Sequence, residues 1–311
     1  MEFLHTSVMP REVIEYLGCR DGRVYVDGTL GGGGHALEIL RSSGPSGRVI
    51  GIDLDDEAIK AASKTLSAYG DRVTLVKGNF RDLKTILSGL GAGPVDGVVL
   101  DLGVSSYQFE SPERGFSFRF EAGLDMRMDR SGKVTARDLV NTLDARELKR
   151  IFREYGEERE AGRIARAIEK ARESKPVETT GDLVRIVLDA VPRRFQPKNI
   201  HPATRVFQAL RIAVNDELVS VEKGVNGGIE SLKAGGRMAV ISFHSLEDRI
   251  VKTAFRESSA GCVCPPRVPI CVCGRQPATR LLTRKAVTPS DEELAANPRA
   301  RSAKLRAVEK L

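Results

Sequence analysis

The sequence has no tryptophan, and its aromatic residues amount to only 5% of the chain. Proteins that bind single strands stack successive bases on aromatic side chains, so any such platform here has to be sparse. No apolar run approaches the roughly 20 residues that a membrane span requires. The first ten residues include Glu2 and His5 and form no continuous apolar segment, so we expect no signal peptide. These absences predict a cytoplasmic protein that does not enter a membrane.

Cysteine is also scarce, with five in 311 residues, and a chain of this length does not need disulfides to hold its core. Four of the five form two closely spaced pairs, Cys262 with Cys264 and Cys271 with Cys273. Four thiolates are the right number for a closed structural zinc site, although the one-residue gaps are tighter than the usual two to four. Zinc ligands, free thiols and a redox disulfide all stay open, and we predict no catalytic metal.

The charge balance is modestly basic, with 49 lysines and arginines against 42 acidic residues, a net charge of +7. That excess is too small for a coat that condenses nucleic acid, but it fits a protein that meets a polyanion on one face. At about 150 residues per domain, the length predicts two domains or one domain with a large insertion.

Glycine is concentrated near the N-terminus, between two short apolar runs that are typical of strands. Residues 23–27 form the first run, residues 28–34 the glycine-rich turn, and a helix is expected from Ala36. The second run covers residues 48–53 and ends at Asp53, 20 residues beyond Gly33. This is the order of a nucleotide-binding βαβ unit, in which such an acidic residue accepts hydrogen bonds from the ribose hydroxyls.

The alternation of strands and helices continues, with strands expected at residues 73–76 and 95–100, the latter ending at Asp101. Strands that alternate with helices form a parallel sheet covered on both faces. Later strands are expected near residues 238–243, 279–287 and 303–308, the last two completing a mixed sheet. The sequence therefore predicts a doubly wound α/β domain of the Rossmann-like class.

Two cofactor classes compete for the glycine-rich turn. Gly31, Gly33 and Ala36 satisfy the spacing of a dinucleotide fingerprint, which favours an NAD-dependent oxidoreductase. Three other features favour S-adenosylmethionine. Asp27 lies directly before the turn, where a carboxylate repels a pyrophosphate but holds an ammonium. Phe80 follows the third strand, where its ring can cover an adenine, and Asp101 ends the fourth.

A helical segment interrupts the sheet pattern after the fourth strand. Apolar residues recur there at helical spacing, with N-caps expected at Thr135, Asp144 and Thr180. We predict a discontinuous sheet domain, residues 1–108 and 213–311, and an inserted all-α domain, residues 109–212. Because the flanking strands both end at the ligand edge of the sheet, the insertion is expected to recognise the substrate.

Six segments together resemble one family, the ribosomal RNA small-subunit methyltransferases H, also called MraW. They are residues 28–35 (GTLGGGGH), 101–106 (DLGVSS), 114–118 (RGFSF), 201–210, 242–249 (SFHSLEDR) and 297–302 (NPRARS). The resemblance implies a class I methyltransferase that methylates N4 of one cytidine in 16S rRNA. It also implies S-adenosylmethionine contacts from Gly33, Gly34, His35, Asp53, Phe80, Asp101 and Gln108.

The chemistry adds candidates for contacts with the cytosine amine. This amine is a poor nucleophile, so catalysis requires acceptors that hold it in line with the methyl group. Asp101 and His244 are our candidates, with Ser105 behind them, although His244 could equally satisfy nearby backbone.

Basic residues are expected to contact RNA phosphates in two clusters. They are Arg193, Arg194, Lys198, Arg205 and Arg211, and then Arg280, Arg284, Lys285, Arg299, Arg301, Lys304 and Arg306. The expected partner is small-subunit rRNA within the ribosomal subunit, and a homodimer is possible. A non-enzymatic alternative also stays open, in which the chain is an RNA-binding assembly factor whose cofactor pocket is vestigial.

Overall fold

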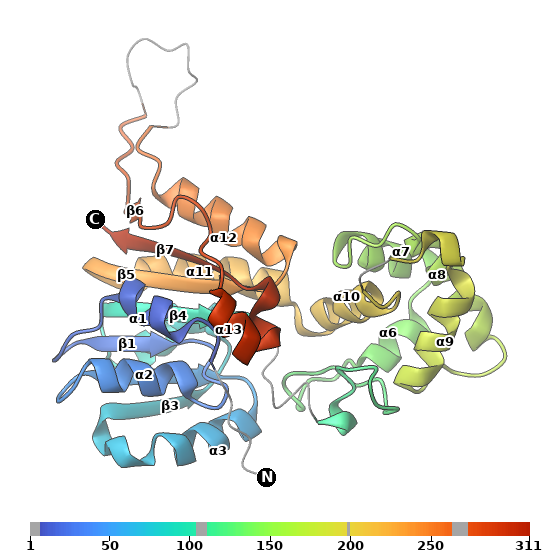
Figure 1. Cartoon of the computed structure of the whole chain (residues 1–311), viewed down its shortest axis with the longest axis horizontal. Coiled ribbons are helices and arrows are strands. Elements are labelled where there is room, and N and C mark those ends of the chain that lie inside the picture. The colour runs from blue at the N-terminus through green and yellow to red at the C-terminus, as the bar shows by residue number, and fades with distance from the viewer. Residues whose placement is uncertain (1–6, 104–110, 198–199, 263–272) are drawn as a thin grey trace. The chain divides into compact units, whose positions relative to one another are not determined.

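The computed structural model describes residues 7–103, 111–197, 200–262 and 273–311. The chain divides into two compact units: a sheet unit, Met1–Gly103 with Leu218–Leu311, and an inserted unit, Val104–Glu217. Figure 1 shows both, with the strands in the sheet unit and a group of helices in the inserted unit. Among the described helices, none is both long enough and apolar enough to cross a membrane.

The sheet unit is built on a seven-stranded sheet in the order β3-β2-β1-β4-β5-β7-β6. The first five strands of this order are parallel, and β7 runs antiparallel to both β5 and β6. The strands are β1 (Val24–Asp27), β2 (Arg48–Asp53), β3 (Val73–Lys77), β4 (Val95–Asp101), β5 (Leu232–Ser242), β6 (Thr279–Leu281) and β7 (Lys304–Lys310). The predicted mixed sheet is confirmed.

Two strands differ in extent from the prediction. β5 begins at Leu232, six residues early, because a bulge lets Leu232 pair with Val95 before regular pairing resumes at Arg237. β6 ends at Leu281 instead of continuing to Val287, which makes only an isolated bridge to Leu305. The apolar pattern alone does not show that the chain leaves the sheet between Leu281 and Val287.

Helices cover both faces of the sheet. Successive strand residues point to opposite faces, and their side chains pack into two separate apolar clusters. Val99 packs into one cluster with residues of α1, α2 and α3, whereas Val98 and Leu100 pack into the other with α4, α11 and α12. The helices are α1 (Pro10–Leu17), α2 (Gly34–Ser42), α3 (Asp56–Thr65), α4 (Leu83–Gly89), α11 (Glu217–Ser231), α12 (Ser245–Ser258) and α13 (Asp291–Ala296). This is the doubly wound arrangement that the sequence predicts.

The inserted unit has its own core, formed by helices that pack apolar faces together. They are α6 (Ala136–Thr142), α7 (Ala145–Glu154), α8 (Ala161–Arg172), α9 (Thr180–Ala190) and α10 (Thr204–Asn215). Thr135 and Asp144 cap α6 and α7 as predicted. The predicted cap Thr180 is wrong by one residue. Thr179 caps α9, because the Thr180 hydroxyl donates to Phe120 O at 2.8 Å instead.

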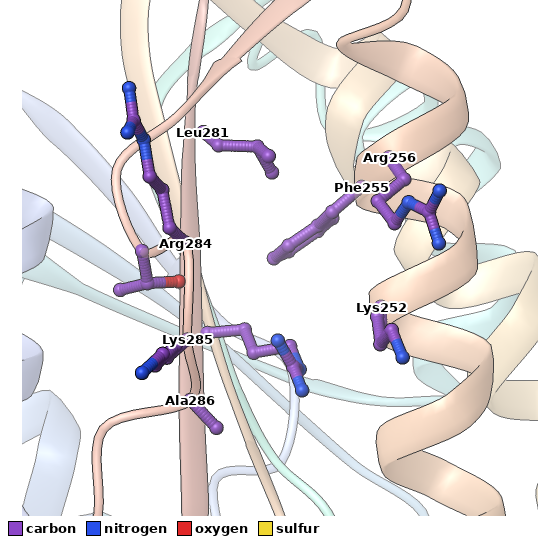
Figure 2. Close-up of a pocket in the computed structure, with 9 residues that line it drawn as sticks. Lys252, Phe255, Arg256, Leu281, Arg284, Lys285 and Ala286 are labelled. Carbon is purple, nitrogen blue, oxygen red and sulfur yellow. The ribbon is translucent and has the colours of Figure 1, made fainter.

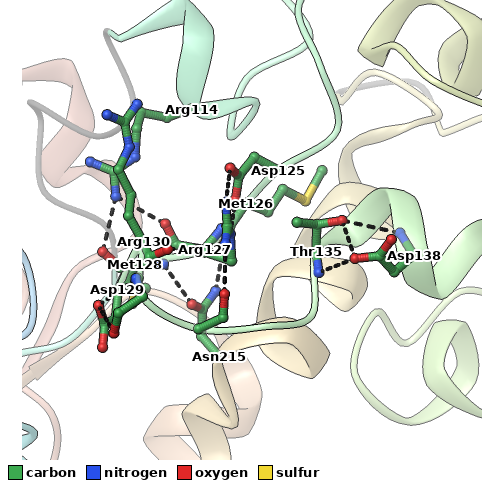
Figure 3. Close-up of polar contacts among 12 residues, drawn as sticks. Arg114, Asp125, Met126, Arg127, Met128, Asp129, Arg130, Thr135, Asp138 and Asn215 are labelled. Carbon is green, nitrogen blue, oxygen red and sulfur yellow. Dashed lines mark hydrogen bonds and ion pairs between the residues drawn. The ribbon is translucent and has the colours of Figure 1, made fainter.

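Polar contacts fix the irregular segment that precedes α6 (Figure 3). Arg114 is only 2% exposed and donates to the carbonyl oxygens of Arg127 and Met128 at 2.9 and 3.0 Å. Asn215, at the end of α10, donates to Met126 O and accepts from Met128 N, both at 2.7 Å. Arg114 therefore holds this segment in place from within the inserted unit.

Candidate active site

A glycine-rich turn joins β1 to α2 at the carboxyl edge of the sheet. Gly31 and Gly33 have φ angles of +52° and +85°, which glycine adopts without the strain that a side chain would bring. A Cβ on Gly28 would lie 2.4 Å from Leu100 Cδ2, so this position has no room for a side chain. α2 begins at Gly34, and the first N–H groups of a helix have no partner within it. The turn therefore offers backbone donors at the sheet edge.

All three acidic strand ends are hydrogen-bonded to this turn. Asp53, at the end of β2, accepts from Gly31 N at 2.8 Å and from Asp55 N at 2.9 Å. Burial raises the pKa of Asp53, and these backbone hydrogen bonds oppose the shift. At the end of β4, the backbone N–H of Asp101 donates to Thr29 Oγ1 at 2.6 Å. The sequence pattern did not predict this role of Thr29, because a threonine in a turn carries no sign of a partner so distant in the chain.

The third strand end, Asp27, is the most deeply buried acidic group of the site at 1% exposure. Its Oδ1 accepts from Thr29 N at 3.2 Å, whereas Oδ2 has no hydrogen-bond partner among the described residues. Burial raises the pKa of Asp27 to about 6, and the neighbouring His35 opposes the rise. Asp27 therefore presents an unused acceptor atom within the protein.

His35, in the first turn of α2, brings an imidazole to the same place. Its side chain is 5% exposed, and Nε2 lies 3.4 Å from Asp101 Oδ2, close enough for an ion pair but without hydrogen-bond geometry. Burial is the largest influence on the His35 pKa and lowers it, but Asp101 and Asp27 together outweigh burial and raise it. The charged form of His35 is thus stabilised by the two carboxylates.

Buried polar atoms without a hydrogen-bond partner gather at this edge. Within the described part of the chain, they are Asp27 Oδ2, Asp101 Oδ1 and both ring nitrogens of His35. Leaving one such atom unsatisfied costs about 1–3 kcal/mol, so a group of them indicates a site completed by a polar ligand. A ligand ammonium would satisfy the carboxylates, whereas the charge of a pyrophosphate would be repelled by Asp27, Asp53 and Asp101.

Phe80 begins a short 3-10 turn after β3 and is partly buried. Its ring packs against the cluster beneath α11, where a Cβ on Gly224 would lie 2.4 Å from Phe80 Cδ2. The glycine thus lets α11 come close to the Cδ2 edge of the ring. Phe80 as a whole keeps intermediate exposure, and contact of its ring with an adenine stays a prediction.

His244 lies just beyond β5, the neighbour of β4, and it is the N-cap of α12. Its Nδ1 accepts from Glu247 N at 3.4 Å, and its Nε2 lies 3.1 Å from Glu247 Oε1. Glu247 Oε2 in turn accepts from His244 N at 3.3 Å, which completes a capping box, and it also accepts from Phe243 N at 2.8 Å. These contacts show that His244 caps α12. This is the second of the two roles expected for His244, hydrogen bonding to nearby backbone, and contact with the cytosine amine stays a prediction.

Several predicted residues lie outside the described part of the chain: Ser105, Gln108, Lys198, Cys264 and Cys271. Of the remaining pair of clustered cysteines, the sulfur atoms of Cys262 and Cys273 lie 3.9 Å apart. A disulfide bond measures about 2.05 Å, so these two are not joined by one.

Some of the predicted RNA-binding cations already have acidic partners in the fold. In the inserted unit, Nε and Nη2 of Arg211 each donate to Glu217 at 2.8 Å. In the sheet unit, Arg280 pairs with Glu309 at 2.7 Å, and Arg306 pairs with Asp248 at 2.7 Å. These contacts give Arg211, Arg280 and Arg306 a role in the fold itself.

The strand order, with β7 antiparallel between β5 and β6, is that of the class I methyltransferases. The acidic residue at the end of β2 and the glycine-rich turn after β1 are where such folds hold a nucleoside cofactor. The sequence profile of the MraW methylase family matches residues 2–311, and the chain belongs to this family. The predicted resemblance is confirmed, and the oxidoreductase alternative is wrong.

Three similar proteins are each named ribosomal RNA small subunit methyltransferase H. That of Pelobacter propionicus is 58% identical over 310 residues, covering 99% of both chains. That of Geobacter sp. (strain M21) is 56% identical and covers 100% of this chain and 99% of its own. That of Symbiobacterium thermophilum is 53% identical, with coverages of 100% and 98%. Among solved structures, an rRNA methylase from Streptococcus thermophilus matches at 12% identity and a TM-score of 0.40, over 97% of this chain and 93% of its own.

Proposed function

We propose that this methyltransferase transfers a methyl group from S-adenosylmethionine to N4 of one cytidine in 16S rRNA of the small ribosomal subunit. The observation that carries the proposal is the group of unpartnered buried atoms on Asp27, His35 and Asp101 at the sheet edge. The names of full-length relatives at 53–58% identity support rRNA as the substrate. The reaction would take place in the cytoplasm.

The residues at the sheet edge fit this cofactor. When bound, S-adenosylmethionine supplies a methyl group activated by a sulfonium. Asp27 would hold its ammonium, Asp53 its ribose hydroxyls and Phe80 its adenine, while Gly33 and Gly34 bring the backbone close. The resemblance adds His35 and Gln108, of which Gln108 lies outside the described residues.

Asp101 is the residue we place against the cytosine amine. The lone pair of this amine is delocalised into the ring, so the main task of the enzyme is to orient it toward the methyl group. Asp101 Oδ1 is a buried acceptor without a partner, able to accept a hydrogen bond from the amine. His35 Nε2, 3.4 Å from Asp101 Oδ2, would hold the carboxylate in position. His244 and Ser105 stay candidates for additional contacts with the amine.

We assign recognition of the RNA to the inserted unit. Phe195 is 47% exposed, and the Arg194 guanidinium lies over its ring at 4.7 Å from the centroid. An exposed ring with a stacked arginine suits contact with an unpaired base and its phosphate. The target base has to leave its stack to reach a buried site, so single-stranded or distorted RNA is the expected substrate form.

The experiment is methylation of small ribosomal subunits that lack this modification, using labelled S-adenosylmethionine. Digested rRNA should contain labelled N4-methylcytidine from a single position. Asp101→Asn should lower kcat about 10²-fold or more, whereas the control Asp71→Asn, at an exposed position, should not.

Cofactor binding without any label in the RNA would refute the substrate. Label at another nucleotide would refute the N4-cytidine assignment. If the chain were a non-catalytic assembly factor, Asp53→Ala would leave its effect on subunit assembly unchanged. Under our proposal this variant loses methylation.

A further inference from the structure

A cavity away from the candidate active site lies in the sheet unit, between α12 and the chain that follows β6. Its volume is about 290 Å³, and five of its nine lining residues are cations. They are Lys252, Arg256, Arg284, Lys285 and Arg306. Figure 2 shows Phe255 directed from α12 toward the opposite segment, with Lys252 and Arg256 on the helix and Leu281 directed into the same space.

The positive charge of this basic pocket is largely uncompensated. Arg306 pairs with Asp248 at 2.7 Å, and that same carboxylate lies 3.7 Å from Lys304. The structure assigns no hydrogen bond or ion pair to the side chains of Lys252, Arg256, Arg284 or Lys285 among the described residues. Lys252 and Arg256 also stand four residues apart on one helix face, where like charges are destabilising. A bound anion would remove this repulsion.

The backbone that carries these cations is held firmly. Phe255 is 1% exposed and belongs to the core cluster under α12. On the other side, Thr283 Oγ1 accepts from Ala307 N at 2.9 Å, and Val287 pairs with Leu305. In Figure 2 the charged ends of Arg284 and Lys285 are directed away from Phe255, on the far side of the cavity from α12. Long cationic side chains on a fixed base suit a ligand with several separate negative charges.

We propose that this basic pocket binds the phosphodiester backbone of the substrate RNA, outside the reaction centre. The inference rests on the proposed function, because it takes the polyanion to be rRNA. A membrane surface fits less well, since peripheral binding to lipid needs apolar side chains beside the charge. Among the described residues, the large exposed apolar side chains are Leu90, Phe120, Val134, Leu188, Phe195, Ile200, Val219 and Leu311, none of them a lining residue.

The test is the salt dependence of binding to unmodified small ribosomal subunits, with Lys252→Ala/Arg256→Ala as the pocket variant. Each lost phosphate contact lowers the slope of log K against log salt by roughly 0.7–0.9. Two lost contacts should therefore lower it by about 1.5 and weaken binding roughly tenfold or more at 0.1 M salt. We expect a higher KM, an unchanged kcat and an unchanged cofactor affinity. Arg284→Glu/Lys285→Glu should give the same pattern.

The matched control removes two exposed cations from the same unit, Arg11→Ala/Lys223→Ala, and should retain the wild-type slope. A wild-type slope in both pocket variants would overturn the proposal and leave the proposed function intact. If the wild-type protein bound the subunits without methylating them and the pocket variants still lowered the slope, the proposed reaction would fail while the pocket assignment stood. If the wild-type protein bound no subunits, both would fall.

Discussion

Replacing Asp27 by asparagine should stabilise the protein at neutral pH in the absence of cofactor. In the folded protein, burial raises the pKa of Asp27 from its ordinary 3.8 to about 6. Above pH 6 the carboxylate is ionised in both the folded and unfolded states, so folding bears the full unfavourable free energy of burying the charge. Below about pH 4 the group is neutral in both states, and this contribution vanishes.

The magnitude follows from the pKa difference of about 2.2. At 1.36 kcal/mol for each pKa unit, this corresponds to about 3 kcal/mol. Asparagine keeps an oxygen that can accept from Thr29 N, so the local turn should survive. We therefore expect Asp27→Asn to raise the free energy of unfolding by up to about 3 kcal/mol above pH 6, with the gain lost as the pH falls to 4.

The assay is urea unfolding of both proteins without cofactor between pH 4 and pH 8, followed by circular dichroism. Cofactor binding is measured in parallel, and loss of a charge-assisted hydrogen bond to the ammonium should weaken it by about 1.5–3 kcal/mol. Equal stability of the two proteins at pH 8, or a difference that grows as the pH falls, would refute the electrostatic account of Asp27.

Three further predictions concern other parts of the two units. Gly28→Ala places a Cβ 2.4 Å from Leu100 Cδ2, so it should lower stability by about 1–3 kcal/mol in urea unfolding; an unaltered midpoint would show that the turn has room. His244→Asn retains a good N-cap, so unchanged kcat would assign His244 to capping alone, whereas a fall in kcat at unchanged stability would place it in the reaction. Phe152→Ala, at a fully buried position in the inserted unit, should lower stability by about 3–5 kcal/mol. Because the two units have separate cores, cofactor affinity should not change, and its loss would contradict that separation.

Much of the sheet unit was predictable because its signals are local. β1 to β4 are short runs rich in β-branched residues and bounded by turn residues, and the glycines of residues 28–34 mark a turn in which Gly31 and Gly33 have positive φ angles. Asp55 caps α3 by accepting from Glu57 N, an interaction that spans two residues and is visible in the sequence. The exceptions depend on distant partners. β6 is shorter than its apolar pattern, and Thr179 caps α9 because the chain near Phe120 uses the hydroxyl of Thr180.

The candidate site was only partly predictable for the same reason. Asp53 and Phe80 follow from their positions after strands, whereas the link from Thr29 to Asp101 joins residues 72 positions apart. His244 caps α12 through its contacts with Glu247. The three-residue spacing of these two residues is compatible with a cap, but the sequence alone did not predict one. The sequence indicated only part of the basic pocket. Arg284, Lys285 and Arg306 were predicted to contact RNA, whereas Lys252 and Arg256 look like an ordinary charged helix face in the sequence. Only the fold places the chain beyond β6 opposite these two residues.

The sequence by itself determined the class of fold, the order of most of its elements and the family, because periodicity, turn residues and contiguous motifs are properties of neighbouring residues. Tertiary structure decided which polar atoms lack partners. Burial of Asp27, the approach of His35 to Asp101 and the unpaired cations around Phe255 each arise where segments far apart in the chain meet. Hydrogen bonding and desolvation depend on everything that surrounds an atom, so only the folded chain shows which of its groups are left to bind a ligand.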